Sequence, residues 1–316
     1  MAFTISELHT SARNVLSPHL KKAQKLALLS QGIALGVNLL LCVLDVILEA
    51  TMDQNGGLSG MALRSALTTV TSIFSLAVNF LTPFWNINLV FIFLGFARNQ
   101  DQSTGALLEG FHRFGPFLRY ILLVFLLTSG LSIGIFYVFS ILVSILPTNP
   151  ELSAIILENQ EAFFTDPEAT IALIPRHLLL EAMLPAIGIL FLLFLLIMIP
   201  LSYRLRLGEY AIMDKPGTTA RAALSFSLRR MRGNCLKAFR LDLHFWWYYL
   251  ALAGLSALAQ LDSLLSAIGI AFPFSGSASR LICYALYALG MLVLTWYAIP
   301  IVQTTYAKFY TEINEE

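Results

Sequence analysis

Long runs of apolar residues alternate with shorter polar stretches along most of the chain. Each run is near or above the ~20 residues that a helix needs to cross a bilayer. We therefore predict an all-α polytopic membrane protein with six transmembrane helices, joined on one side by two amphipathic elbow helices. The predicted spans lie at about 26–49, 66–97, 118–146, 178–203, 243–261 and 280–303.

The placement of lysine and arginine predicts the orientation of these spans. All but three of the 20 Lys and Arg lie in segments that an even number of spans separates from the N-terminus; the exceptions are Arg64, Arg176 and Arg280. Cytoplasmic loops carry the excess of positive residues. We therefore predict a cytoplasmic N-terminal segment over 1–25, a six-helix domain over 26–303 and a cytoplasmic tail over 304–316.

The composition supports membrane insertion and gives no sign of a cofactor. The chain has 316 residues, of which 57% are hydrophobic and 12% charged, whereas soluble domains have about 25% charged residues. Cys42, Cys235 and Cys283 are far apart in sequence, so we expect neither a disulfide framework nor a zinc site. No nucleotide-binding or metalloprotease motif occurs. We expect no cofactor, no metal and no nucleic-acid partner.

The most basic segment, residues 203–249, lies between the fourth and fifth runs. Residues 214–217 predict a turn, Thr218 or Thr219 predicts a helix N-cap, and Gly233 predicts the exit from that helix. We interpret the helix as lying at the membrane surface among anionic headgroups; the alternative is docking of a cytoplasmic partner. The candidate contacts are Arg221, Arg229, Arg232, Lys237 and Arg240.

Polar residues follow one face of the first predicted span and one face of the second. Lipid disfavours such faces, so both should point into the helix bundle. They are either packing seams joined by hydrogen bonds or the walls of a polar cavity in which Asp45 binds a cation or a proton. The candidate cavity residues are Gln31, Asn38, Asp45, Asn79, Thr82 and Asn86.

A weak internal repeat involves the second, fourth and sixth spans. Each carries a proline in its inner half: Pro83, Pro200 and Pro300. Ten residues after each proline stands an aromatic residue, in order Phe93, Tyr210 and Tyr310. Duplication explains this spacing, and so does chance in an apolar chain of low complexity.

Four motifs near the predicted inner side carry a family resemblance. They are L-x-x-G-F-x-R-F at 107–114, S-x-x-R-M-R-G-N at 227–234, F-x-L-D-L-x-F-x-W at 239–247 and I-P-x-x-x-T-x-Y-A-x-F-Y at 299–310. The chain thereby resembles the uncharacterised bacterial family called domain of unknown function 975, with His244 as a departure from the usual small residue. The resemblance implies a multi-pass protein of the bacterial inner membrane and brings no activity with it.

These patterns favour a non-enzymatic membrane protein with an envelope or assembly role. Its basic inner face would engage anionic lipid, a protein partner or another copy of the chain. The alternative is a transporter or channel-like protein that uses the polar faces of the first two spans for a small solute. An enzyme ranks third, because no pair of catalytic residues can be named.

Overall fold

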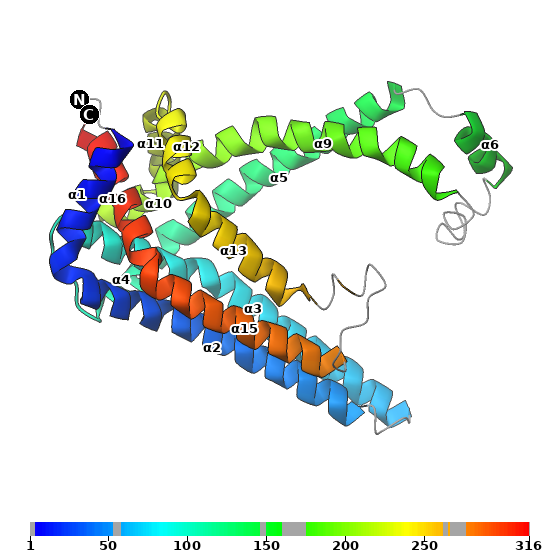
Figure 1. The fold of residues 1–316 in the computed structure, drawn as a ribbon, viewed down its shortest axis with the longest axis horizontal. Coiled ribbons are helices and arrows are strands. Elements are labelled where there is room, and N and C mark those ends of the chain that lie inside the picture. Colours follow the sequence, from blue (N-terminus) through cyan, green and yellow to red (C-terminus); the bar gives the residue numbers. More distant parts are fainter. Residues whose placement is uncertain are drawn as a thin grey trace. The chain divides into compact units, whose positions relative to one another are not determined.

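The structure, a computed structural model, describes residues 4–52, 58–145, 150–159, 175–261, 265 and 276–315, and every element within these ranges is helical (Figure 1). The elements before residue 175 are α1 (Ile5–Leu16), the 3₁₀ turn η1 (Ser17–His19), α2 (Leu20–Met52), α3 (Leu58–Ala97), α4 (Ala106–His112), α5 (Phe114–Ile145) and α6 (Pro150–Glu158). They are followed by α9 (Arg176–Leu205), α10 (Leu207–Asp214), α11 (Ala220–Arg230), α12 (Cys235–His244), α13 (Trp246–Ala259), α15 (Gly276–Tyr297) and α16 (Ile299–Glu315).

Several of these helices have the length and composition of membrane spans. Within the described ranges, four stretches qualify: Ile5–Leu44, Phe114–Leu142, Leu184–Asp214 and Ser279–Tyr297. Two shorter apolar helical segments are Asn86–Ala97 and Trp246–Ala259. The four long stretches overlap the first, third, fourth and sixth predicted spans, and the shorter segments fall on the second and fifth.

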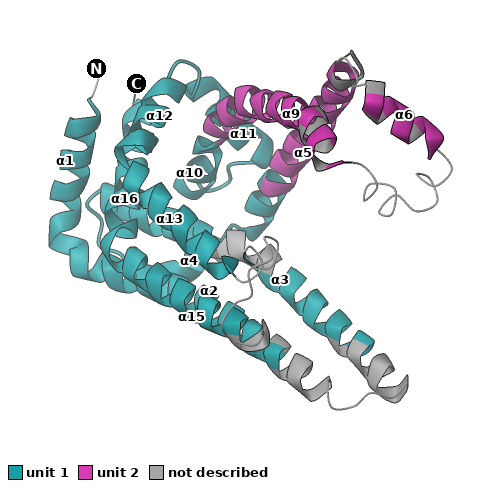
Figure 2. Cartoon of the chain, turned by 45° about the vertical axis from the view of Figure 1, so that its right-hand side comes forward, with its two compact units in different colours: residues 1–120, 206–316 teal, residues 121–205 magenta. Residues whose placement is uncertain are grey.

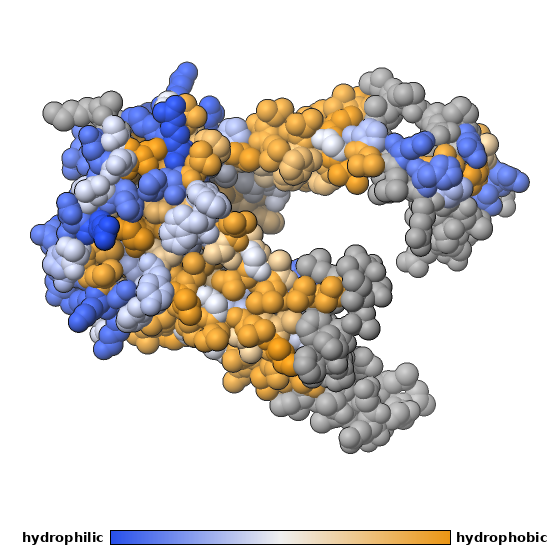
Figure 3. Space-filling model, viewed as in Figure 1, coloured by the Kyte–Doolittle hydropathy of each residue, from blue (hydrophilic) through white to orange (hydrophobic). Residues whose placement is uncertain are grey.

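The chain divides into two compact units (Figure 2). Unit 1 comprises Met1–Tyr120 and Arg206–Glu316, and unit 2 comprises Ile121–Leu205. In unit 2 the large apolar side chains of α5 and α9 are mostly exposed, among them Phe125, Ile133, Phe191 and Leu196. Figure 3 shows the hydrophobic surface over α9. Soluble monomers rarely expose apolar surface of this extent, and lipid is the medium that would cover it.

Unit 1 is built on three long helices that lie side by side, α2, α3 and α15 (Figure 1). α13 packs against α15, while α10 and α16 both pack against α3. The interior there is filled by Phe93, Phe96, Ile212 and Tyr310, which are all buried. Burial of apolar and aromatic side chains of this size is the main favourable term in such packing.

The basic segment folds locally as the sequence predicts. Thr219 is the N-cap of α11, and its side chain accepts a hydrogen bond from a backbone N–H in the first turn. Gly217 and Gly233 take positive φ angles of 83° and 89° on either side of the helix, which glycine adopts without the steric cost of a Cβ atom. Ala223 and Met231 are fully buried on the inward face.

The sixth predicted span extends too far along the chain. α15 ends at Tyr297 and α16 begins two residues later, so residues 299–303 belong to a second helix. Pro300 has no N–H for the carbonyl oxygen of Trp296, four residues earlier. Gln24 of α2 supplies the missing donor, with its Nε2 atom 3.2 Å from that oxygen. The break is therefore stabilised by a side chain from a neighbouring helix.

The three aromatic residues of the proposed repeat all lie in the core of unit 1. Phe93 of α3, Tyr210 of α10 and Tyr310 of α16 are all buried. The rings of Tyr210 and Tyr310 stack with centroids 5.3 Å apart. All three residues are therefore core residues, while the duplication itself stays a prediction.

A buried carboxylate ties the same three helices together. Asp214 at the end of α10 lies 2.6 Å from Nη1 of Arg98, which follows α3, and only 7% of its side chain is exposed. The hydroxyl of Tyr310 donates to the other oxygen of Asp214 at 2.9 Å. Removal of one partner from such a cluster leaves an uncompensated buried charge, so these contacts fix the positions of α3, α10 and α16 relative to one another.

Candidate functional site

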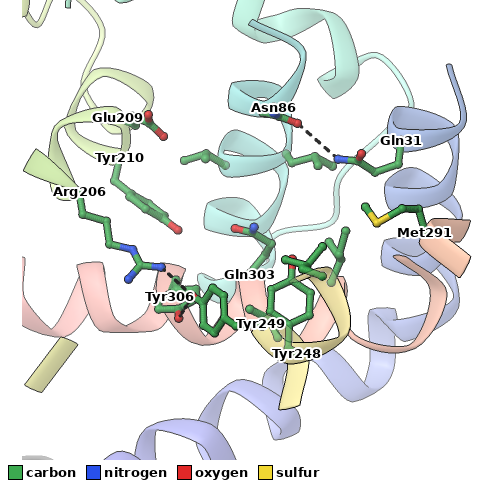
Figure 4. A pocket seen from close by; sticks show the side chains of 15 residues that line it. Gln31, Asn86, Arg206, Glu209, Tyr210, Tyr248, Tyr249, Met291, Gln303 and Tyr306 are labelled. Carbon is green, nitrogen blue, oxygen red and sulfur yellow. Dashed lines mark hydrogen bonds between the residues drawn. The ribbon is translucent and has the colours of Figure 1, made fainter. Parts of the chain in front are cut away.

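Unit 1 contains a cavity of about 450 Å³ near the start of α10 (Figure 4). Its walls come from α2, α3, α10, α13, α15 and α16, so side chains from most of the unit converge on it. The lining combines apolar residues with two charged groups, three amides and four tyrosines. The polar members are Gln31, Asn86, Arg206, Glu209, Tyr210, Tyr248, Tyr249, Gln303 and Tyr306.

Arg206, the residue before α10, is held by Asp242 of α12. Its Nη1 atom lies 2.8 Å from Oδ1 and 2.9 Å from Oδ2 of that carboxylate. The guanidinium also lies over the ring of Tyr306, with Cζ 4.0 Å from the ring centroid. Both interactions favour arginine in a partly buried position. The positive charge of Arg206 is therefore neutralised by a partner beside the cavity.

Two tyrosine hydroxyls complete this cluster. The hydroxyl of Tyr306 donates to Oδ1 of Asp242, and the hydroxyl oxygen of Tyr249 lies 2.7 Å from that of Tyr306. Arg206 donates from Nη2 to the hydroxyl of Tyr249 at 3.3 Å. Burial raises the pKa of Tyr306 above its ordinary value, so this phenol remains a hydrogen-bond donor at neutral pH.

Glu209 is the second carboxylate of the site, three residues after Arg206. It is partly buried in the cavity wall. Among the described residues it forms no hydrogen bond and no ion pair; burial raises its pKa above the ordinary value, and the charge of Arg206 opposes that shift. Asp242 makes the direct contacts to the guanidinium. Glu209 is therefore a second carboxyl group in the site without a direct partner among the described residues.

The amide groups provide further hydrogen-bonding capacity. Nε2 of Gln31 donates to Oδ1 of Asn86 at 3.4 Å, a long hydrogen bond drawn as a dashed line in Figure 4. Gln303 of α16 also lines the cavity. Asn86 and Tyr249 are exposed, so the cavity opens to the surface of unit 1.

The structure brings together two of the six predicted cavity residues, Gln31 and Asn86. Asn38 does not line the cavity. Its Nδ2 atom donates to the carbonyl oxygen of Ala34 in its own helix at 2.8 Å. The side chains of Asp45, Asn79 and Thr82 lie outside the part of the chain that the structure describes. The cavity therefore lies at the end of the polar faces that the sequence assigns to the cytoplasmic side.

The predicted basic contacts form a separate surface. Arg221 and Arg229 on α11, Arg232 in the turn after it and Arg240 on α12 are exposed, and Lys237 is partly buried. None of the five lines the cavity. Lipid or partner contact and cavity binding are thus two different features of unit 1.

Sequence reasoning missed the residues at the centre of the site. Arg206 and Asp242 are 36 residues apart, and Asp242 and Tyr306 are 64 apart, so no local spacing indicates their contact. Asp242 and Tyr306 do belong to the motifs that carry the family resemblance, which is the one available signal. Tyr248 and Tyr249 of α13 also line the cavity, and no sequence pattern had indicated this.

Replacement of Asp242 by Asn is expected to lower the free energy of unfolding by about 1–3 kcal/mol, because it leaves Arg206 without its direct anionic partner in a partly buried position. Thermal unfolding of the purified full-length protein measures this. Asp101→Asn is the matched control, since Asp101 pairs with Lys22 at an exposed position. Equal melting temperatures for Asp242→Asn and the wild type would contradict the role given to this ion pair.

Comparison with known proteins gives a family and no further relatives. No curated protein matches the chain, and no solved structure matches it. A family model described as "Protein of unknown function (DUF975)" matches residues 1–316, the whole chain. The resemblance noted in the sequence motifs is confirmed, and the protein belongs to the DUF975 family.

Proposed function

We propose that the protein is a non-enzymatic component of the bacterial inner membrane whose cytoplasmic face binds anionic lipid headgroups, in an envelope or assembly role. The observation that carries this proposal is an exposed apolar stripe on α12 beside a group of exposed arginines. We call these residues the α11–α12 surface; they are Arg221, Arg229, Arg232, Leu236, Phe239, Arg240 and Leu243.

The apolar stripe has the spacing of one helix face. Leu236, Phe239 and Leu243 are 59%, 46% and 59% exposed. Trp246, at the start of α13, continues the stripe and is 60% exposed. Residues at such steps line up along a helix. Water disfavours a stripe of this kind, whereas the boundary between headgroups and acyl chains accommodates it.

The arginines supply the charge that an anionic membrane surface attracts. Arg221, Arg229, Arg232 and Arg240 are exposed and form no ion pair within the described ranges. Figure 3 shows strongly hydrophilic side chains over α11. Guanidinium groups bind phosphate oxygens in a bidentate manner, and each basic residue near an anionic surface contributes about 1 kcal/mol.

Lipid is favoured over a protein partner because the stripe continues into α13, an apolar helix that falls on the fifth predicted span. A soluble partner would have to cover α12 and stop where the membrane begins. The remaining alternative is that a second copy of the chain binds the α11–α12 surface. In that case, substitution of the same residues would change the oligomeric state.

The combined change of Arg221, Arg229, Arg232 and Arg240 to Gln should reduce the preference of the full-length protein for phosphatidylglycerol over phosphatidylcholine at least tenfold. The expected size follows from about 1 kcal/mol for each arginine, partly screened by salt. Native mass spectrometry of protein released from nanodiscs of mixed composition measures the retained lipids.

Neutralisation of four other exposed cations, Arg13, Lys21, Arg119 and Lys215, is the matched control for that variant. It should change the lipid preference much less. An unchanged preference in the first variant, or the same loss in both, would remove the proposed role of the α11–α12 surface.

The proposal includes six spans with both termini in the cytoplasm. The lysine and arginine asymmetry supports this topology, as do the four long apolar stretches and the two shorter ones. Epitope tags at the two ends should both be inaccessible in intact spheroplasts and accessible after lysis. A tag at either end that reacts from outside would show an odd number of spans or the reverse orientation.

A second candidate function is the transport of a small solute. The cavity favours it, because Gln31 and Asn86 from the two predicted polar faces form part of the wall. Its volume of about 450 Å³ lies in the ordinary range of small-molecule sites. Saturable binding of a soluble ligand in this cavity is the property that a transporter needs and a purely lipid-binding protein lacks.

A further inference from the structure

We infer that the cavity in unit 1 is a binding site for a small organic cation, in which Glu209 pairs with an ammonium group of the ligand. This inference deepens the second candidate function. It is independent of the lipid-binding α11–α12 surface, so the two proposals can fail separately.

The charge of the site favours a cationic ligand. Arg206 and Asp242 neutralise each other through two contacts of 2.8 and 2.9 Å. Glu209 lines the cavity without a hydrogen bond or ion pair to any described residue. A buried carboxyl group without a partner tends toward its neutral form, whereas a cation beside it stabilises the carboxylate, so Glu209 is suited to pair with a cationic ligand.

The contacts of Arg206 make an anionic ligand less suitable. The guanidinium of Arg206 uses Nη1 for Asp242 and Nη2 for the hydroxyl of Tyr249, and one of its faces covers the ring of Tyr306. Asp242 thereby compensates the positive charge of Arg206, and an anion in the cavity would also approach the carboxyl group of Glu209. Figure 4 shows Arg206 directed toward Tyr306.

The chemistry of the walls also favours a cationic ligand. Tyr210, Tyr248, Tyr249 and Tyr306 supply aromatic rings and hydroxyl oxygens. Aromatic rings beside a carboxylate are the surroundings in which proteins bind ammonium groups, because the ring face is electron-rich. The amide oxygen of Gln303 offers an additional acceptor for an N–H group. The walls therefore match an organic ammonium compound.

The volume of the cavity favours an organic cation over a metal ion. The cavity of about 450 Å³ is far larger than a bare ion needs. No group of three or more His, Cys, Asp or Glu residues within the described ranges has the arrangement of a metal site. A divalent metal would usually draw on several carboxylates, and here one carboxylate is available. An organic cation fills the volume and needs only one.

The ammonium group could belong to a soluble amine or to the headgroup of a lipid such as phosphatidylethanolamine. Both present the same chemistry to Glu209. The soluble amine would enter from water and the headgroup would belong to the bilayer. A test in a bilayer of controlled composition therefore separates the two sources.

The test measures the reaction of Glu209 with a carbodiimide in the full-length protein, followed by mass spectrometry. The protein is placed in nanodiscs of phosphatidylglycerol, and choline or tetramethylammonium is added, because these quaternary ammonium ions do not react with a carbodiimide-activated carboxyl group. At least one of these ions should slow labelling of Glu209 severalfold with a saturable dependence on concentration. Labelling of Glu109 and Asp101, which lie outside the cavity, should not respond and is the internal control.

Nanodiscs that contain phosphatidylethanolamine provide the second arm. If the headgroup is the occupant, labelling is already slow there and soluble amines have no added effect. If a soluble amine is the occupant, protection appears only when the amine is added. Absence of protection in both arms, or protection by sulfate instead, would overturn the inference.

Direct binding adds a variant to this measurement. Glu209→Gln keeps the shape of the side chain and removes its charge, so the affinity for the protecting amine should fall at least tenfold by calorimetry. Glu109→Gln is the matched control with unchanged affinity. Should Glu209→Gln fail to fold, Gln303→Leu and the labelling measurement on the wild type still decide the outcome. Equal affinity of the wild type and Glu209→Gln would contradict the role of this carboxylate.

Discussion

The contact between Arg206 and Asp242 is the interaction on which the described part of unit 1 depends most. It joins the start of α10 to α12, and the hydroxyls of Tyr249 and Tyr306 bring α13 and α16 to the same point. A guanidinium at the end of a long apolar helix is costly to desolvate unless such partners surround it. The network therefore sets where these helices meet, and the cavity is the space that remains beside it.

The same network explains why the cavity contains a carboxyl group without a direct partner among the described residues. Asp242 binds the guanidinium of Arg206 from outside the cavity. Glu209, three residues after Arg206, lines the cavity and makes no direct ionic contact within the described ranges. Proteins retain such incompletely neutralised groups at binding sites, where a ligand completes the set of contacts. The α11–α12 surface differs from the cavity, because we propose that its exposed arginines and apolar stripe contact the phosphate groups and acyl chains of lipid.

Periodicity predicted the all-helical fold, and turn residues predicted the ends of α11, because both depend on residues close together in sequence. The turn at Gly217, the N-cap at Thr219 and the exit at Gly233 all depend on residues close in sequence. The break before Pro300 was not predicted, since it relies on the Gln24 side chain far away in the sequence. The site was predicted only in part for the same reason. Polar spacing identified Gln31, whereas the contacts of Arg206 come from helices distant along the chain.

Asp242 is the direct partner of Arg206, and we propose that Glu209 is the carboxyl group that binds a ligand. The most direct measurement is the melting temperature of ligand-free Glu209→Gln in detergent. We expect a melting temperature equal to or above that of the wild type, because the substitution removes a buried carboxyl group without a direct partner, as at other binding sites where function costs stability. A clear loss of stability would mean that Glu209 is a structural partner of Arg206, and would contradict the account.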